Sequence, residues 1–299
     1  MDIVVFGAGS LGSLVGGLLA QAHEVTLVGR DPHVAAVADG GLTVEGAFDV
    51  SVTPDATTGG TGLRADLALV TVKAYDTTEA ARTLATGEYG AALSLQNGMG
   101  NEATLDEFLD CPVLAGTATY GAVRSGPGRV ECTGVGEVAL GPCEGGDSAA
   151  AARAARAFRR ADLNTTVHGD MPRRLREKLA VNAGINAVTA LSRVENGALL
   201  DGPANDLTRS AARETARVAR AADVSLPNRV ALAAVEEVAT ATADNDSSML
   251  QDVRGGRRTE VDAINGYVVD RAAEFGLDAP VNRTLTALLG AWERERDLR

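Results

Sequence analysis

The chain has 299 residues, of which 45% are hydrophobic and only 3% aromatic, and its formal net charge is −12. This length suits one large domain or two of ordinary size. The acidity argues against nucleic acid and anionic membranes as partners. Because the chain has neither an uncharged apolar run of 18 residues nor the basic start of a signal peptide, we expect a soluble, cytoplasmic protein.

Apolar segments in the first half predict buried strands. They are residues 1–7, 23–30, 65–73, 90–98 and 112–120. Helical patterns at residues 8–22, 77–85 and 101–109 separate several of them. This alternation predicts parallel β-α-β units in an open sheet with helices on both faces. The turn-rich residues 124–142 predict an antiparallel annex, and residues 144–161 a single amphipathic surface helix.

A glycine-rich turn follows the first predicted strand and opens a helix, the context that gives a G-x-G-x-x-G pattern its meaning. In this turn Gly7 permits the tight bend, Gly9 lets a pyrophosphate approach the backbone, and Gly12 lets the helix pack close to the strand. The expected cofactor-binding residues here are Gly7, Ala8, Gly9, Ser10, Leu11 and Gly12. The alternative is a glycine turn without a ligand.

The ends of the following strands refine the cofactor site. Arg30 favours the 2′-phosphate of NADP, whereas Asp31 is able to serve the ribose diol of NAD, so we expect NADP(H) and leave NAD(H) open. Lys73 and Asn97 end the next two strands on the same carboxyl edge. For Lys73 the alternative is a solvated strand-end cation, and for Asn97 a purely local turn.

From about residue 173 the sequence has helical periodicity almost throughout, in residues 175–191, 206–222, 229–243 and 263–276. We therefore predict an α/β Rossmann-type dinucleotide-binding domain over residues 1–168, followed by an all-α substrate and catalytic domain over residues 169–299. The oligomeric state is not readable, and a homodimer is left open.

Lysine is almost absent: 26 of the 28 basic residues are Arg, and the two lysines are Lys73 and Lys178. With the acidity and the high Ala and Gly content, this composition is typical of a salt-loving organism, a hypothesis that activity and folding at molar salt would support. Lys178, Asn182 and Asn186 lie four residues apart and line one helical stripe. Asn is a poor helix former, so the stripe indicates a polar cleft; the alternative is hydrogen bonding to a neighbouring helix.

Reduction of a carbonyl by hydride creates negative charge on oxygen, and a proton must arrive there. A partly buried lysine beside a cofactor has a lowered pKa and can donate that proton, whereas arginine holds its proton at any physiological pH. Lys178 is therefore the candidate general acid. Further on, Ser247 and Ser248 are candidates to cap a helix from Met249. Glu260 is predicted in a helix with Val261, and its alternative is a surface ion pair with Arg257.

The chain resembles the ketopantoate reductase (2-dehydropantoate 2-reductase) family over nearly its full length. The resemblance rests on GAGSLG (7–12), VTVKAYD (70–76), QNGMG (96–100), EKLAVNAGINAVTAL (177–191), NG (196–197), SSMLQDVRGGRRTEVDAINGYV (247–268) and a closing helix after GLDAPVN (276–282). The lysine helix and the SSMLQD segment are far more specific than the glycine loop.

This resemblance implies NADPH-dependent reduction of 2-dehydropantoate to (R)-pantoate, a step toward coenzyme A. It implies Lys178 as the general acid, Glu260 as the residue that binds the substrate hydroxyl and orients the lysine, and Ser248 as the ligand of the substrate carboxylate. It implies that Arg30 and Lys73 meet the phosphate end of NADP. The residues implied to hold substrate, nicotinamide or both are Asn97, Asn182, Asn186 and Asn245. Where many relatives carry Gln, this chain has Asp76, a departure that bears on NADPH preference.

Two other functions remain as alternatives. One is a related 2- or 3-hydroxyacid dehydrogenase, and a screen of small 2-oxo acids would distinguish it from a ketopantoate reductase. The other is a non-catalytic NADP sensor, which would bind without turnover. We expect no metal, because the three cysteines (Cys111, Cys132 and Cys143) form no ligand pattern and the three histidines (His23, His33 and His168) are interpreted as surface residues.

Overall fold

The computed structural model describes all residues from 1 to 299 and divides into two compact units. The sheet unit comprises Met1–Gln96 and Gly100–Met171, and the helical unit comprises Asn97–Met99 and Pro172–Arg299. The long helix α6 (Met171–Ser192) begins at the division, so its first residue belongs to the sheet unit and the rest to the helical unit.

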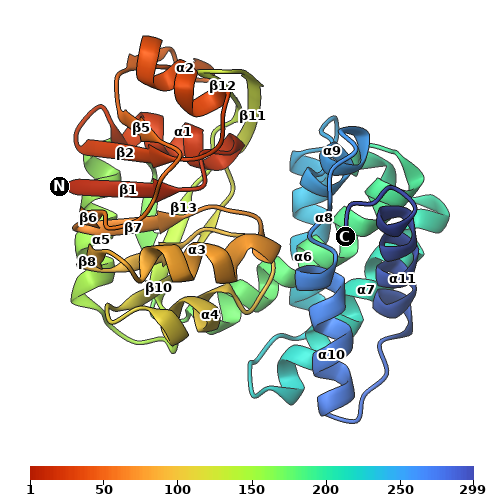
Figure 1. Cartoon of the computed structure of the whole chain (residues 1–299). Helices are drawn as coiled ribbons and strands as arrows, with labels where there is room; N and C mark the ends of the chain where they lie inside the picture. The colour runs from red at the N-terminus through yellow and green to blue at the C-terminus, as the bar shows by residue number, and fades with distance from the viewer. The chain divides into compact units, whose positions relative to one another are not determined.

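The sheet unit is built on eight strands in the order β14-β13-β10-β9-β7-β1-β2-β5. Figure 1 shows β2, β1 and β7 side by side in this sheet. They are β1 (Asp2–Phe6), β2 (Glu24–Val28), β5 (Asp55–Thr57), β7 (Leu67–Val70), β9 (Ala92–Ser94), β10 (Val113–Ala118), β13 (Val138–Pro142) and β14 (Thr165–Val167). Every neighbouring pair is parallel except β10 and β13. All five strands predicted from the sequence are confirmed, and they form most of this sheet.

Helices cover both faces of the sheet, as the sequence predicts. Along β7, Leu67 and Leu69 pack in the cluster that holds Leu14 of α1 (Ser10–Leu19). The intervening Ala68 and Val70 pack in the cluster of the opposite face. Because successive side chains of a strand point to opposite sides, this alternation places two cores on the two faces. Helix α5 (Ala149–Arg160) packs on the α1 side, and α3 (Thr77–Leu84) and α4 (Asn101–Phe108) pack on the other.

A second sheet has four strands in the order β11-β12-β3-β4. These are β3 (Leu42–Gly46), β4 (Val50–Val52), β11 (Gly121–Gly126) and β12 (Arg129–Gly134). The antiparallel pair β11–β12 confirms part of the expected annex. The remainder of that prediction is wrong, because β13 joins the main sheet. Its residues Val138, Ala139 and Leu140 are all fully buried, as suits a strand covered on both faces.

The smaller elements of the sheet unit are α2 (His33–Gly40), η1 (Ala74–Asp76), β6 (Arg64–Ala65) and β8 (Glu88–Tyr89). The helical unit contains α6, η2 (Asn196–Leu199), α7 (Gly202–Ala221), α8 (Asn228–Ala241), α9 (Ser248–Arg254), η3 (Asp262–Gly266), α10 (Tyr267–Glu274) and α11 (Pro280–Arg294). The prediction of an all-helical second half is confirmed.

One local prediction in this unit is wrong. Glu260 does not lie in a helix, because the chain is irregular up to Val261 and then forms the single π-helical turn η3. Gly266 N donates to Val261 O, five residues back, which is the spacing of a π turn. Helix α10 starts only after this turn, at Tyr267.

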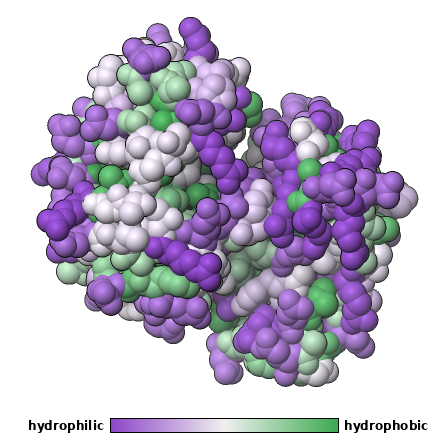
Figure 2. Space-filling model, in the orientation of Figure 1, coloured by the Kyte–Doolittle hydropathy of each residue, from purple (hydrophilic) through white to green (hydrophobic).

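Hydrophilic side chains cover most of the visible surface, with apolar residues in small patches (Figure 2). None of the helices combines the length and the apolar character needed to span a membrane.

Candidate active site

The glycine loop joins β1 to α1 and is fixed by backbone contacts. Gly7 N and Ala8 N both donate to Val28 O at 2.9 Å. Thr71 Oγ1 donates to Gly7 O at 2.8 Å, which ties the loop to the end of β7. Gly7 has a φ of +116°, and a Cβ there would lie 2.6 Å from Val72 N, so no other residue fits this position.

The other two glycines of the motif have opposite surroundings. A Cβ on Gly12 would lie 2.1 Å from Gly7 O, so the close packing of α1 against the loop requires glycine. A Cβ on Gly9 would meet nothing nearer than 4.0 Å, which leaves this backbone open to a ligand. Helix α1 starts at Ser10 without a side-chain cap, so its first N–H groups are available to an anion. These features fit a dinucleotide pyrophosphate.

The remaining loop residues hold the start of α1 in place. Ser10 Oγ accepts a hydrogen bond of 3.1 Å from Arg124 N of β11. Ala8 is buried, and Leu11 packs against the main core. The six residues predicted from the motif therefore form the turn between β1 and α1 and the first residues of α1.

Both charged residues after β2 contact protein groups. Arg30 Nη2 lies 3.2 Å from Asp76 Oδ2, in an ion pair whose arginine side chain is 85% exposed. Asp31 Oδ1 instead accepts a hydrogen bond of 3.2 Å from Ala35 N, in the first turn of α2. The carboxylate that would compete with a 2′-phosphate for Arg30 is therefore that of Asp76, not that of Asp31.

Lys73 lies beyond the carboxyl end of β7, the strand that pairs with β1. Its backbone oxygen accepts from Asp76 N at 2.8 Å and starts the short helix η1. Because carboxyl ends of parallel strands meet at one edge, Lys73 lies on the same edge as the glycine loop and Arg30.

Asn97 belongs to a short segment that packs with the helical unit rather than with the sheet. Met99 N donates to Ala263 O at 3.0 Å, and a Cβ on Gly98 would lie 2.6 Å from Ala263 Cβ. Ala263 follows Glu260 by three positions in the chain. The segment of Asn97 is thus bonded to the turn that follows Glu260.

Helix α6 carries the predicted polar stripe. Lys178 and Asn182 are partly exposed, and Asn186 is 6% exposed. The flanking residues Leu179 and Ile185 lie in the core of the helical unit. The helix is confirmed, and its regular four-residue spacing places the three polar side chains along one face.

The start of α9 is fixed against α6 by a shared hydroxyl. Ser247 Oγ accepts from Leu250 N at 3.1 Å and so caps α9, as predicted for one of the two serines. The same oxygen lies 2.7 Å from Thr189 Oγ1 of α6. Ser248 is exposed at the first position of α9, and it is Ser247, not Ser248, that makes the capping bond. Sequence reasoning did not identify Thr189.

The loop that carries Asn245 is held by the Asn-Gly pair of the family motif. Asn196 N donates to Asn245 O at 3.1 Å, and Asn196 Nδ2 donates to Thr242 Oγ1 at 2.9 Å. A Cβ on Gly197 would lie 2.9 Å from Ala243 Cβ. The Asn-Gly pair thus positions the loop that leads into Ser248.

Glu260 is 5% exposed and lies in the irregular connection between α9 and η3. The residue expected as its alternative partner, Arg257, is paired with Asp252 at 3.1 Å. The turn after Glu260 is bonded to α6 through Asn265, whose Nδ2 donates to Ala183 O at 3.0 Å. The sequence analysis also did not identify Asn265, although an asparagine inside an apolar helical pattern indicates a buried polar contact.

The interpretation of His33 as a surface residue is wrong. The side chain is 1% exposed, its Nε2 lies 2.9 Å from Ser13 Oγ, and its Nδ1 accepts from Gly128 N at 3.1 Å. Burial lowers the pKa of His33, and the charge of Arg124 lowers it further. The histidine therefore joins α1 and α2 to the β11–β12 hairpin.

All three cysteines are free, and burial raises the pKa of each, that of Cys143 to about 12. No group of three or more His, Cys, Asp or Glu side chains is arranged to hold a metal ion.

Models of the ketopantoate reductase PanE/ApbA family match this chain. The family model covers residues 3–145, and the model of its C-terminal part covers residues 170–293. Together these two matches account for most of both units.

Individual relatives match over essentially the whole chain. A 2-dehydropantoate 2-reductase of Halobacterium salinarum is 44% identical over 303 aligned residues, covering 99% of this chain and 100% of the relative. The crystal structure of a PanE/ApbA family ketopantoate reductase from Ralstonia eutropha JMP134 superimposes with a TM-score of 0.91 at 34% identity, covering 99% and 100% of the two chains. D-mandelate dehydrogenase with NADH and anilino(oxo)acetate gives a TM-score of 0.93 at 26% identity over 100% of both chains.

Proposed function

The chain belongs to the ketopantoate reductase family, and from that premise we propose that the protein catalyses the NADPH-dependent reduction of 2-dehydropantoate to (R)-pantoate in pantothenate and coenzyme A biosynthesis. The observation that carries the proposal is the 44% identity to a 2-dehydropantoate 2-reductase over the full length of both chains. The acidic, lysine-poor composition and the haloarchaeal relative support a protein adapted to high salt.

The sheet unit is the proposed cofactor-binding unit. The open backbone at Gly9 and the uncapped start of α1 fit the pyrophosphate. Arg30 and Lys73, on the same edge of the sheet, are the proposed ligands of the 2′-phosphate end. When bound, NADPH supplies the hydride that reduces the keto carbon.

The helical unit supplies the proposed proton donor. As hydride reaches the keto carbon, the carbonyl oxygen becomes an alkoxide, and a proton from Lys178 Nζ completes the alcohol. A lysine suits this role because its ammonium is a much stronger acid than a guanidinium, which holds its proton at any physiological pH. In a chain with 26 arginines and two lysines, a purely electrostatic role at position 178 would have been open to arginine.

The other proposed ligands lie on elements that are bonded to α6. Glu260 is proposed to bind the substrate hydroxyl and orient Lys178, and the turn after it is bonded to α6 through Asn265. The Ser248 hydroxyl is proposed to bind the substrate carboxylate, at the start of a helix that is fixed to α6 through Thr189. The amides proposed to hold substrate, nicotinamide or both are Asn97, Asn182, Asn186 and Asn245.

A second candidate function is a 2-hydroxyacid dehydrogenase that acts on another 2-oxo acid. The likeness to D-mandelate dehydrogenase, which was solved with NADH, favours it. The Arg30–Asp76 ion pair bears on the cofactor alone, because a carboxylate beside Arg30 opposes the 2′-phosphate of NADPH and so favours NADH.

The test is an NADPH- and NADH-oxidation assay at molar salt with 2-dehydropantoate and a panel of small 2-oxo acids. The proposal expects the highest kcat/KM for 2-dehydropantoate with NADPH. A higher kcat/KM for another 2-oxo acid establishes the second candidate. Cofactor binding without turnover of any 2-oxo acid identifies a non-catalytic sensor and refutes both.

A further inference from the structure

The residue before Glu260 is bonded to a buried carboxylate from the end of the chain. Thr259 N donates to Glu293 Oε1 at 2.8 Å, and Thr259 Oγ1 donates to the same oxygen. The hydroxyl of Thr259 in turn accepts from Val261 N at 3.3 Å. Glu293 is 0% exposed, and it lies on α11. One carboxylate therefore anchors the backbone on the N-terminal side of Glu260.

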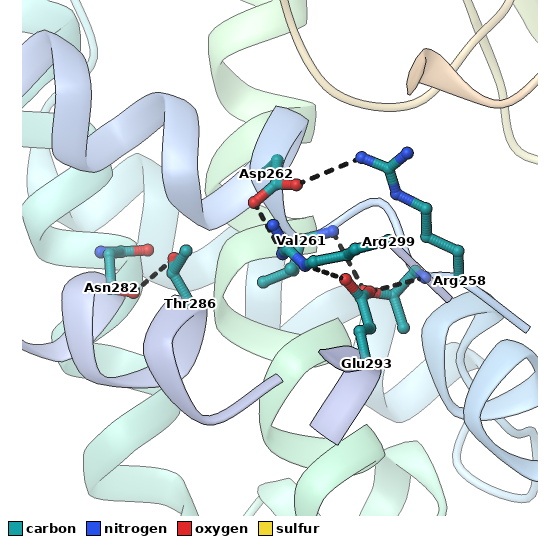
Figure 3. Close-up of polar contacts among 8 residues, drawn as sticks. Arg258, Val261, Asp262, Asn282, Thr286, Glu293 and Arg299 are labelled. Carbon is teal, nitrogen blue, oxygen red and sulfur yellow. Dashed lines mark hydrogen bonds and ion pairs between the residues drawn. The ribbon is translucent and has the colours of Figure 1, made fainter. Parts of the chain in front are cut away.

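The residue two positions after Glu260 is bonded to the same cluster through Arg299. Arg299 Nη2 donates to Asp262 Oδ1 at 2.9 Å, and Arg299 Nε donates to Glu293 Oε2 at 2.6 Å (Figure 3). Arg258 Nη2 lies 3.6 Å from the second oxygen of Asp262. The Arg299 guanidinium thus bridges two carboxylates, and this anchors the backbone on the C-terminal side of Glu260.

The charges of this cluster depend on one another. Glu293 is fully buried, and a buried carboxylate is tolerated when a cation and hydrogen-bond donors compensate it. Arg299 provides the cation, and Thr259 provides two donors. If an uncharged residue replaces Arg299, the carboxylate of Glu293 remains buried without a compensating cation. The contacts to Thr259 and Asp262 are then disturbed together.

We propose that Glu293 and Arg299 are positioning residues for Glu260. They hold Thr259, immediately before Glu260, and Asp262, two positions after it, while Glu260 itself lies in a connection without regular structure. This inference rests on the proposed function, because it assigns these residues a role through Glu260. A displacement of about 1 Å at a group that contacts substrate is able to reduce turnover by about 100-fold.

The test compares Arg299→Gln in two backgrounds, the wild type and Glu260→Ala. With 2-dehydropantoate and NADPH, we expect Arg299→Gln alone to lower kcat/KM about tenfold or more, while the Kd for NADPH stays within about twofold. In the Glu260→Ala background the same substitution has no further effect on kcat/KM, because the residue that it positions is absent.

Conservative and control variants complete the design. Arg299→Lys keeps the charge but replaces the two donor nitrogens Nε and Nη2 with a single nitrogen, so its kcat/KM should lie between wild type and Arg299→Gln. Glu293→Gln keeps an acceptor for Thr259 but loses the pair with Arg299, and it should behave like Arg299→Gln. The matched control is Arg283→Gln, also on α11, whose exposed pair with Asp278 should be dispensable for activity.

The outcomes separate the two proposals. Suppose that Glu260→Ala reduces kcat/KM. The positioning role is then overturned if Arg299→Gln has no effect on kcat/KM, or if the two substitutions reduce kcat/KM independently in the double variant. In both cases the proposed function stands. If Glu260→Ala itself retains the wild-type kcat/KM, the role of Glu260 fails, and the positioning role fails with it. If Arg299→Gln does not fold, Arg299→Lys and Glu293→Gln carry the same comparison in both backgrounds.

Discussion

Asn265 Nδ2 donates a hydrogen bond of 3.0 Å to Ala183 O, and this contact joins the π-helical turn after Glu260 to the helix of Lys178. The same nitrogen donates to Asn282 Oδ1 at 2.9 Å. Asn282 Nδ2 in turn donates to the buried carboxylate of Glu214 at 2.7 Å. One chain of buried polar groups therefore connects α6, η3, α11 and α7, and it fixes the elements that carry the proposed acid and its partner.

Removal of the central amide should destabilise this network. Asn265→Ala removes the bond to Ala183 O and the donor to the buried Oδ1 of Asn282, so we expect a loss of about 2 kcal/mol in the free energy of unfolding. Denaturant unfolding measures it. The double variant Asn265→Ala/Asn282→Ala should lose less than the sum of the single losses, because the two side chains share one hydrogen bond. Strict additivity would show that the network has no cooperative role.

The two neighbouring serines should separate stability from substrate binding. Ser247→Ala removes the cap of α9 and the partner of Thr189, so it should lower the free energy of unfolding by about 1 kcal/mol. Ser248→Ala should leave stability within about 0.5 kcal/mol and raise KM for 2-dehydropantoate about tenfold, as expected for a lost hydrogen bond to a carboxylate. Thermal unfolding and initial rates measure the two effects. An unchanged KM in Ser248→Ala contradicts its proposed role.

Asp76 should oppose NADPH through its pair with Arg30. Asp76→Asn keeps the size of the side chain and removes its charge, so we expect the KM for NADPH to fall about two- to fivefold relative to that for NADH, an effect of about 0.5–1 kcal/mol for an exposed pair. The ratio should be measured at the lowest salt that supports the fold, because salt screens such pairs. Asp31→Asn is the control. If Asp31→Asn changes the ratio of the KM for NADPH to the KM for NADH more than Asp76→Asn does, then Asp31, and not Asp76, is the carboxylate that opposes NADPH.

The buried His33 should make stability depend on pH. Burial and Arg124 lower its pKa, so below its ordinary value of about 6.5 the unfolded chain binds a proton that the folded chain does not. The stabilisation from neutral His33 is therefore complete above about pH 6.5 and is lost as the pH falls toward the lower, folded-state pKa. Protonation also removes the acceptor for Gly128 N. Melting temperatures between about pH 5 and 8 should show this slope in the wild type and a reduced slope in His33→Gln; equal slopes would exclude His33 as the cause.

The sheet unit was predictable because its signals are local. The strands are short apolar runs, and the glycine spacing of residues 7–12 depends only on the turn that those residues form themselves. The lysine helix was also predictable, because its three polar residues recur with a helical period. In each case the residues that carry the pattern are the residues that form the element.

The errors have the opposite origin. His33 has polar neighbours in the sequence, and it is buried by a hairpin that contains Gly128, 95 positions away. Val261, Ile264 and Val268 have helical spacing, and the extra residue of the π turn does not show in that pattern. The partner of Thr259, Glu293, lies 34 positions further along the chain. Contacts between segments this distant leave no periodic trace.

The most direct measurement is the single-turnover and steady-state reduction of 2-dehydropantoate by Lys178→Ala and Lys178→Arg, with the Kd for NADPH measured in parallel. The account predicts that both variants bind NADPH like the wild type and lose on the order of 10²–10⁴ in kcat, because neither side chain is able to deliver a proton. Wild-type turnover in either variant would contradict the claim that the ammonium at position 178 is the acid of the reaction.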